Sequence, residues 1–209
     1  MKARILASIV VAGTAGLAHG QAVTGFTGGS QFGSFFGGTV AGDTVGWQFT
    51  VNEDIFVTGL GVWNGDTQLG LEGLTSNHQV GIWNLGSGAL LIDGVAGPGG
   101  SVIGAWTYSS VADTVLTTGN TYVIGAVYTS TDGDSYISSA SSVTMASAIN
   151  FGGGRSPLAA NGGFALPGTF SGATSLGRFG PNFTFRPVPT PGAIAVLGLG
   201  GLVATRRRR

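Results

Sequence analysis

Residues 44–51 read TVGWQFTV, and this stretch decides the fold class. Successive side chains of a β-strand point to opposite faces of a sheet, so a strand with one covered face has an apolar residue at every second position. The stretch has this alternation: its apolar positions are Val45, Trp47, Phe49 and Val51, and between them lie Gly46, Gln48 and Thr50. It therefore predicts a strand of an antiparallel sheet with one apolar and one polar face.

Similar stretches recur on both sides of it, and no long segment has helical periodicity. Runs rich in β-branched and aromatic residues predict further strands at residues 55–63, 79–85, 89–92, 101–108, 121–128, 142–151 and 178–185. The strand at 121–128 is apolar on both faces and is expected to be central. This spacing predicts an all-β domain at residues 21–186, with the fold of a two-sheet sandwich or a jelly-roll-like domain.

The charges are unevenly distributed along the chain, although they sum to zero overall. Between residues 21 and 191 there are three arginines, nine aspartates and glutamates and no lysine, which gives this part a net charge of −6. A surface that neutralises phosphates needs clustered positive charge, so no nucleic-acid partner is expected. The chain has no cysteine, which excludes disulfides and thiolate metal sites.

The first segment, residues 1–20, has the pattern of a signal peptide for secretion. A positively charged start is followed by an apolar run at residues 5–18, and small residues occupy the positions that a signal peptidase reads. We predict cleavage between Gly20 and Gln21, with cleavage after Ala22 as the alternative. A membrane anchor is disfavoured because the apolar run is shorter than the roughly 20 residues that a membrane span needs.

The last segment, residues 187–209, begins with a proline-rich stretch, which is extended because each proline fixes its own φ and restricts the residue before it. An uncharged apolar run at residues 192–205 follows, and four arginines end the chain at 206–209. We predict that the run forms a hydrophobic helix of about 21 Å, with the arginines on the cytoplasmic side of a membrane. A buried helix of a globular core is the alternative, but it leaves no place for the arginines.

This tail resembles the PEP-CTERM sorting tails of exported bacterial proteins, which combine a short proline motif, a hydrophobic helix rich in small residues and an arginine-rich end. The matching residues are Pro189, Thr190, Pro191, Gly192, Arg206, Arg207, Arg208 and Arg209. The resemblance implies that an exosortase-type membrane protease removes the segment after the motif, so the membrane anchor is transient. Thr190 stands where the usual motif has an acidic residue, and the bond that is cut stays open.

Part of the domain resembles a module common in PEP-CTERM-tagged proteins of unassigned activity. The matching stretches are residues 46–51, 57–63, 78–83 and 121–126, and residues 180–183 resemble its closing strand. The resemblance implies a β-sandwich and brings no catalytic residues with it.

Few residues of the domain suggest chemistry. His78 is the one histidine left after removal of residues 1–20, and without a Gly-x-Ser-x-Gly motif a structural role for it is favoured over a catalytic one. Asp132 and Asp134 lie in a turn sequence and are weak candidates for calcium binding, because the full EF-hand spacing is absent. No catalytic residue is assigned, and no other metal or cofactor is expected.

Three tryptophans are candidates for glycan binding, because β-sandwiches commonly stack sugars on exposed aromatic rings. Trp63, Trp83 and Trp106 would form such a surface if they point outward. Burial in the core is the alternative, and it is the favoured one because tryptophan is mostly buried in folded proteins.

The sequence as a whole predicts an exported structural or adhesive protein of the cell surface or extracellular matrix, and not an enzyme. Its expected partners are signal peptidase, the exosortase-type protease, the membrane before processing of the tail, and extracellular polysaccharide. A carbohydrate-binding module is the second hypothesis. A glycan-active hydrolase is the third, and it requires two carboxylates about 5 to 10 Å apart in a cleft.

Overall fold

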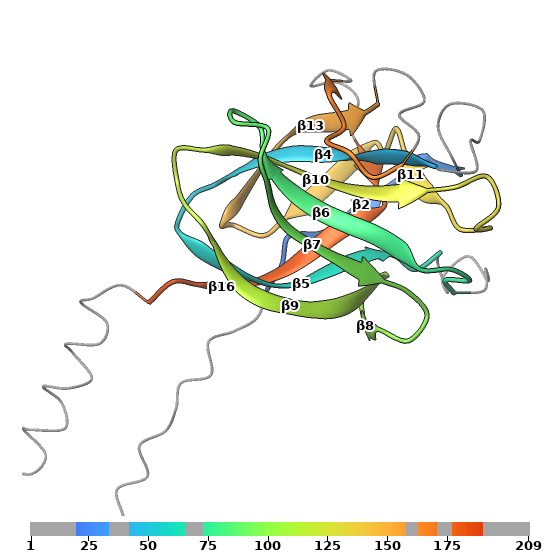
Figure 1. The fold of residues 1–209 in the computed structure, drawn as a ribbon, viewed down its shortest axis with the longest axis horizontal. Helices are drawn as coiled ribbons and strands as arrows, with labels where there is room; N and C mark the ends of the chain where they lie inside the picture. The colour runs from blue at the N-terminus through green and yellow to red at the C-terminus, as the bar shows by residue number, and fades with distance from the viewer. Residues whose placement is uncertain (1–19, 34–41, 66–72, 158–162, 171–176, 190–209) are drawn as a thin grey trace, which may run out of the picture.

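The computed structural model describes residues 20–33, 42–65, 73–157, 163–170 and 177–189 (Figure 1). These residues form strands joined by turns and loops, with no helix among them, so the all-β fold class is confirmed. Within the same ranges no helix has the length and apolar character needed to cross a membrane. The predicted signal peptide up to residue 19 and the hydrophobic helix predicted at residues 192–205 lie outside the described residues.

The largest sheet has six strands in the order β14-β13-β4-β10-β6-β7. Its neighbouring strands are all antiparallel. Their bounds are β14 Thr169–Phe170, β13 Ile149–Ser156, β4 Asp43–Val51, β10 Thr121–Tyr128, β6 His78–Asn84 and β7 Leu90–Ala96.

A second antiparallel sheet has five strands in the order β1-β16-β5-β9-β8. Two smaller sheets, β15-β11-β3 and β12-β2, complete the described structure. The bounds in the five-stranded sheet are β1 Gly20–Gln21, β16 Pro181–Pro187, β5 Ile55–Trp63, β9 Trp106–Leu116 and β8 Ser101–Ile103. Those in the smaller sheets are β15 Arg178–Phe179, β11 Tyr136–Ser138, β3 Ser30–Phe32, β12 Ser142–Met145 and β2 Val23–Thr27.

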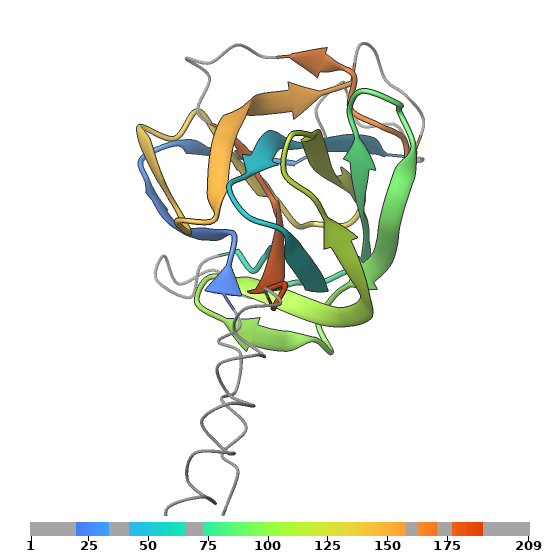
Figure 2. The same cartoon turned by 90° about the vertical axis from the view of Figure 1, so that its left-hand side faces the viewer.

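The two larger sheets face each other across an aromatic core. Trp47 and Phe49 of β4 pack against Phe183 of β16, with ring centroids 6.0 and 5.0 Å apart, and all three side chains are buried. Figure 2 looks from the end where β1 and β16 lie, and it shows strands surrounding this interior. The arrangement is consistent with a β-sandwich, in which the inner faces of two sheets form the core.

The alternation at residues 44–51 is confirmed: Val45, Trp47, Phe49 and Val51 are buried on the inner face of β4. The strand at 55–63 is confirmed as β5, and the one at 121–128 as β10, which lies centrally between β4 and β6.

The prediction of one strand at 142–151 is wrong. The structure has β12 and β13 there, separated by a turn in which the amide of Ile149 donates to the carbonyl of Ala146 at 2.9 Å. The strand predicted at 178–185 is also divided, into β15 and β16 on either side of Gly180. Because of this division, β12 and β15 belong to the two smaller sheets, whereas β13 and β16 belong to the two larger ones. Each of the two predicted strands therefore contributes residues to two sheets.

The first and last described strands end side by side. Gly20 of β1 lies opposite Phe185 of β16, and β16 ends at Pro187. Pro187 in turn lies opposite Ile55, which follows Val51 of β4 after a short turn. We call this end of the domain the proximal pole.

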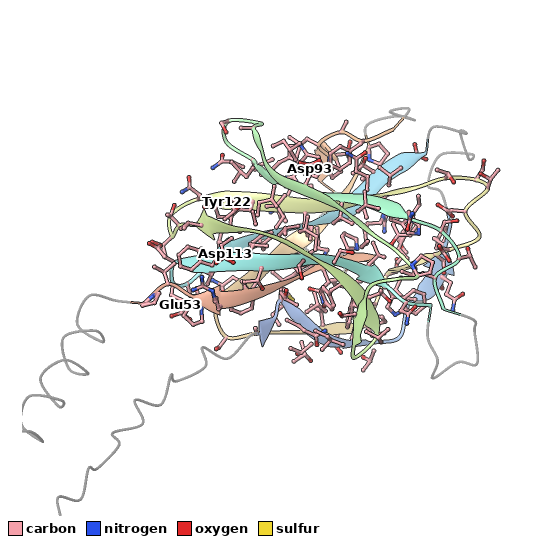
Figure 3. The ribbon with its side chains drawn as sticks, turned by 60° about the horizontal axis from the view of Figure 1, so that its bottom comes forward. Glu53, Asp93, Asp113 and Tyr122 are labelled. Atoms are coloured by element: carbon pink, nitrogen blue, oxygen red, sulfur yellow. The ribbon has the colours of Figure 1, made fainter. Side chains whose placement is uncertain are left out.

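The opposite end, which we call the distal pole, is where β10 ends and where β4 and β6 begin. Tyr128 at the end of β10 lies opposite Asp43, the first residue of β4, and His78 is the first residue of β6. Figure 3 labels Glu53 and Asp113 near the proximal pole, and β10 in Figure 1 points away from it. Loops at the distal pole are therefore remote from both ends of the domain.

Candidate functional site

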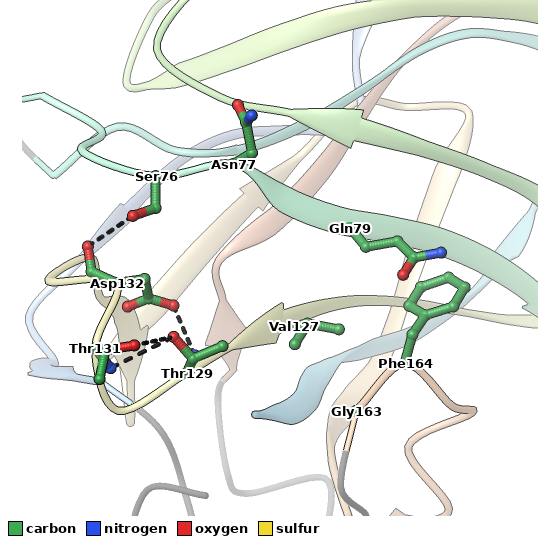
Figure 4. A pocket seen from close by; sticks show the side chains of 9 residues that line it. All are labelled: Ser76, Asn77, Gln79, Val127, Thr129, Thr131, Asp132, Gly163 and Phe164. Atoms are coloured by element: carbon green, nitrogen blue, oxygen red, sulfur yellow. Dashed lines mark hydrogen bonds between the residues drawn. The ribbon is translucent and has the colours of Figure 1, made fainter. Parts of the chain in front are cut away.

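A pocket of about 540 Å³ lies at the distal pole (Figure 4), and we call it the distal pocket. It forms where the start of β6, the loop after β10 and residues 163–168 meet. Among the described residues that line it, most are polar and uncharged, one is a carboxylate, one is aromatic and none is cationic: Ser76, Asn77, Gln79, Val127, Thr129, Thr131, Asp132, Gly163 and Phe164. This lining suits a polar, uncharged ligand better than an anionic or a wholly apolar one.

One wall of the distal pocket is Phe164, which residues 163–168 hold against the outer face of the six-stranded sheet. We call these residues the cover segment. The hydroxyl of Thr44 donates to the carbonyl of Gly163 at 2.8 Å and accepts from the amide of Ala165 at 3.1 Å. Gly163 also forms a parallel bridge with Asp43. The backbone on both sides of Phe164 is therefore fixed to the beginning of β4.

The cover segment can approach the sheet closely because glycines lie beneath it. Gly81 and Gly125 are cross-strand partners on β6 and β10. A Cβ on Gly81 would lie 2.6 Å from Cζ of Phe164, and one on Gly125 would lie 3.3 Å from Cδ of Pro167. The ring of Phe164 also packs on Trp83, with centroids 5.0 Å apart. A side chain at either glycine would push the cover segment outward.

The opposite wall is the loop after β10, which the carboxylate of Asp132 organises. One oxygen of Asp132 accepts from the amide of Thr129 at 2.6 Å, and the other accepts from the amide of Asp134 at 3.2 Å. The carbonyl of Asp132 accepts from the hydroxyl of Ser76 at 3.1 Å, and the hydroxyl of Thr75 donates to the same carbonyl. The loop is thus joined to the segment before β6 by hydrogen bonds.

Behind the pocket lies a buried polar pair, His78 and Asp134. Nε2 of His78 lies 2.9 Å from Oδ2 of Asp134, and Nδ1 lies 2.7 Å from the carbonyl oxygen of Val127. His78 is only 1% exposed, and its ring lies against Tyr128 with centroids 4.7 Å apart. Both ring nitrogens therefore face an oxygen atom of a neighbouring residue. A histidine held in this way is a structural group, and this geometry favours the structural role over the catalytic one.

Asp134 accepts further hydrogen bonds from the segment before β6. The amide of Thr75 donates to Oδ1 at 2.8 Å, and the amide of Ser76 donates to Oδ2 at 2.9 Å. The hydroxyl of Thr75 lies 3.1 Å from Oδ1 and shares its one proton between this oxygen and the carbonyl of Asp132. With His78, four donors surround this carboxylate. Charge-assisted hydrogen bonds of this kind are stronger than neutral ones, so Asp134 is the main link between the two loops.

The calcium hypothesis finds little support in this geometry. Both Asp132 and Asp134 accept from N–H groups, which occupy the oxygens that a calcium ion would need. In the part of the chain that the structure describes, no group of three or more His, Cys, Asp or Glu side chains is placed to hold a metal ion.

Tyr128, which lies against His78, packs on a second buried tyrosine, Tyr136. Tyr128 and Tyr136 pack edge to face with centroids 5.2 Å apart, and neither hydroxyl has a hydrogen-bond partner among the described residues. Burial raises the pKa of Tyr128 well above its ordinary value, and it raises the pKa of Tyr136 to about 12. Both side chains therefore stay neutral in the folded protein well above pH 10.

The three tryptophans do not form an exposed glycan-binding surface. Trp63, Trp83 and Trp106 are 2%, 4% and 2% exposed, so their ring faces are not accessible to a sugar. Trp63 and Trp106 pack on Phe26 in the interior, whereas Trp83 lies on the outer face of the sheet beneath Phe164. Core packing, the alternative favoured from the sequence, holds for Trp63 and Trp106, whereas Trp83 is buried outside the core.

The predicted processing positions are only partly described. Gly20 and Gln21 form β1, and Pro189 is the last described residue. Thr190, Pro191, Gly192 and the four arginines lie outside the described residues. Next to the predicted signal-cleavage site, Ala22 is fully buried and its amide donates to the carbonyl of Phe183 at 3.0 Å.

Sequence reasoning did not find Phe164, Asn77 or Gln79. Phe164 lies in a glycine-rich stretch without any alternating pattern, and its position depends on contacts with β4 and β6. Gln79 carries a signal in retrospect, because it is the outward polar residue between the buried His78 and Val80. Such a residue marks the outer face of a strand but does not identify a pocket on it.

A scan against protein-family models finds no model that matches this chain, and a search of curated proteins finds no match either.

Proposed function

We propose that this chain is an exported structural or adhesive protein, sorted to the cell surface or extracellular matrix and without catalytic activity. In this proposal residues 1–20 direct secretion, and an exosortase-type protease processes the tail at residues 187–209. The domain between them is a jelly-roll-like sandwich that is exposed to the outside. The tail holds the protein in the membrane until it is processed.

The observation that best supports the proposal is the pairing of β1 with β16. Both ends of the domain lie at the proximal pole, and the distal pocket lies at the other. A domain attached at one pole presents the opposite pole to its surroundings. This arrangement suits display at a surface, where contacts are made by the loops farthest from the attachment.

The burial of Ala22 supports cleavage between Gly20 and Gln21 rather than after Ala22. Gln21 contributes as well, because its side-chain amide donates to the carbonyl of Ile103 at 2.8 Å and to the hydroxyl of Tyr108 at 2.9 Å. Cleavage after Ala22 would remove these contacts and the buried Ala22 from the edge of the five-stranded sheet. The earlier cleavage position leaves them in place.

The test is to follow the chain in a bacterium that has an exosortase. We expect a mature N-terminus at Gln21, a shortened C-terminus and recovery of the protein at the cell surface or in the matrix. Replacement of Arg206 to Arg209 by serine should leave the tail unprocessed or send the protein to another location. A mature protein that retains Met1, or wild-type localisation of the arginine variant, would contradict the proposal.

Carbohydrate binding is the second candidate, and the distal pocket is the observation that favours it. A hydrolase is less well supported, because Asp132 is the one carboxylate among the described residues lining the pocket, and its nearest acidic neighbour, Asp134, is occupied by four donors. Glycoside hydrolysis needs a pair of carboxyl groups facing the substrate.

A further inference from the structure

We propose that the distal pocket binds a short neutral saccharide, with Phe164 as the stacking surface and Asn77 and Gln79 as hydrogen-bonding groups. The inference rests on the proposed adhesive function, since it names the ligand class that such a protein would hold. Its chemistry, however, depends only on the described residues and is tested separately from export.

The composition of the lining selects the ligand class. A sugar ring has hydroxyl groups that both donate and accept hydrogen bonds, and it has apolar C–H faces. Amides and hydroxyls also both donate and accept, so Asn77, Gln79 and Thr131 match the first property. The ring of Phe164 matches the second. The volume of about 540 Å³ lies within the range of small-ligand pockets, roughly 300 to 1,000 Å³.

Two other ligand classes fit less well. An anionic ligand would meet the carboxylate of Asp132 and no cationic side chain among the described lining residues. An extended peptide usually binds by pairing with a free strand edge. Here β6 pairs with β10 and β7, and β10 pairs with β4 and β6, so neither strand beside the pocket has a free edge.

The amide groups on one side of the pocket are available for a ligand. Asn77 and Gln79 are exposed, and within the described part of the chain neither side chain makes a hydrogen bond. Figure 4 shows the amide of Gln79 beside the ring of Phe164, whereas the side chain of Asn77, which precedes β6, extends away from the ring. A sugar that stacks on the ring would therefore find a hydrogen-bonding partner in Gln79 at its edge.

The stacking surface is held in place before any ligand arrives. Trp83 supports the ring from below, Gly81 gives it room to approach the sheet, and Thr44 fixes the backbone on both sides. A fixed ring loses little freedom when a ligand binds, and such preorganisation increases affinity. The ring of Phe164 is half-buried and lines the pocket, so part of it remains accessible to a ligand.

The experiment uses the full-length chain, purified in mild detergent, on an array of immobilised oligosaccharides. The array carries neutral hexose and N-acetylhexosamine oligosaccharides next to sulfated and sialylated ones. We expect binding to one or more neutral oligosaccharides and none to the charged set. The affinity for the best free oligosaccharide is then measured by isothermal titration calorimetry.

Three variants locate the binding site. Phe164→Ala should weaken binding at least about tenfold, because it removes the stacking surface. Gln79→Ala should weaken it roughly threefold to tenfold, the effect of one hydrogen bond. Gln79→Ala leaves the fold intact, because the side chain is exposed and unbonded, so it remains informative if Phe164→Ala unfolds the cover segment. The control is Val102→Ala, which shortens an apolar side chain that is 61% exposed on β8 of the five-stranded sheet and should leave affinity unchanged.

Failure of the inference is distinguishable from failure of the proposed function. The inference is overturned if no neutral oligosaccharide binds, if charged ones bind as well as neutral ones, or if Gln79→Ala and Phe164→Ala bind like the wild type. A chain that binds neutral saccharide through Phe164 but stays inside the cell leaves the inference standing and overturns the proposed function. An exported and processed chain that binds no saccharide does the reverse.

Discussion

The strongest test of the distal pole is the substitution Asp134→Asn. The change keeps the size of the side chain but removes its charge and replaces one acceptor oxygen by an NH2 group. Whichever way the amide is oriented, its NH2 group faces a backbone N–H, that of Ser76 on one side or that of Thr75 on the other. At least one hydrogen bond is therefore lost, and the others lose a charged acceptor.

The expected loss of stability is large for so small a change. Each hydrogen bond to a charged group contributes about 1.5–3 kcal/mol, and the bonds that remain weaken when the acceptor loses its charge. Asp134 is 6% exposed at its side chain and His78 is fully buried at its side chain, so solvent does little to replace what is lost. We expect the free energy of unfolding to fall by about 1.5–3 kcal/mol. For a domain of this size, this corresponds to a fall in Tm of roughly 3–12 °C.

The measurement is urea unfolding followed by tryptophan fluorescence, with a thermal scan by circular dichroism. The matched control is Asp93→Asn on β7, where the carboxylate is exposed and makes no hydrogen bond among the described residues. That control should stay within about 0.5 kcal/mol of the wild type. If Asp134→Asn loses less than about 1 kcal/mol, the pair of Asp134 with His78 does not hold the loop, and the reasoning is refuted.

Three further predictions follow from buried groups and close contacts. Tyr128→Phe removes a buried hydroxyl that has no hydrogen-bond partner among the described residues. In urea unfolding, the free energy of unfolding should therefore stay unchanged or rise by about 1 kcal/mol. A clear loss of stability would show that the hydroxyl has a hydrogen-bond partner. Burial raises the pKa of Tyr136 from 10.0 to about 12. The contribution of this neutral side chain to the free energy of unfolding is therefore complete below pH 10, and it is lost as the pH rises from 10 through 12. In Tyr136→Phe, Tm should fall less steeply with pH between pH 10 and 12. A slope of Tm against pH equal to that of the wild type would contradict the role of Tyr136. Gly81→Ala should displace Phe164 and lower the free energy of unfolding by about 1–3 kcal/mol, measured by thermal unfolding. The control is Gly25→Ala, which should be neutral because its Cβ would meet nothing within 4 Å. Equal effects of the two substitutions would contradict the close contact between Gly81 and Phe164.

The strands that could be predicted are those whose own sequence carries the pattern of burial. β4, β5 and β10 are long, and their buried positions follow from alternation or continuous apolar character. β3 could not be predicted, because it has three residues and exists only through pairing with β11. β15 was predicted only as the beginning of one strand at 178–185, because its separate pairing with β11 leaves no mark in two residues. A pattern needs several residues to be visible, whereas a short strand needs only a partner.

The candidate site was much less predictable than the fold. A structural role for His78 was the favoured hypothesis, but its partner Asp134 lies 56 residues away, and no local pattern connects them. The same holds for Phe164, which reaches the pocket only because Thr44 and Gly81 lie beneath the cover segment. Such contacts depend on how β4, β6 and β10 align across the sheet, and that alignment is a property of the folded domain.

The two poles of the domain are stabilised in different ways, and this bears on how the distal pocket keeps its shape. At the proximal pole, strand pairing between β1, β16 and β5 holds the backbone directly. At the distal pole the loop after β10 has little apolar surface to bury, and the chain has no cysteine with which to form a disulfide. Asp132 and Asp134 hold this loop instead, through hydrogen bonds within it and to the segment before β6. The two carboxylates that suggested calcium binding are therefore better explained as groups that keep the pocket wall rigid. A rigid wall facing the fixed ring of Phe164 suits a small neutral ligand, because the one carboxylate among the described lining residues, that of Asp132, already accepts from two backbone amides.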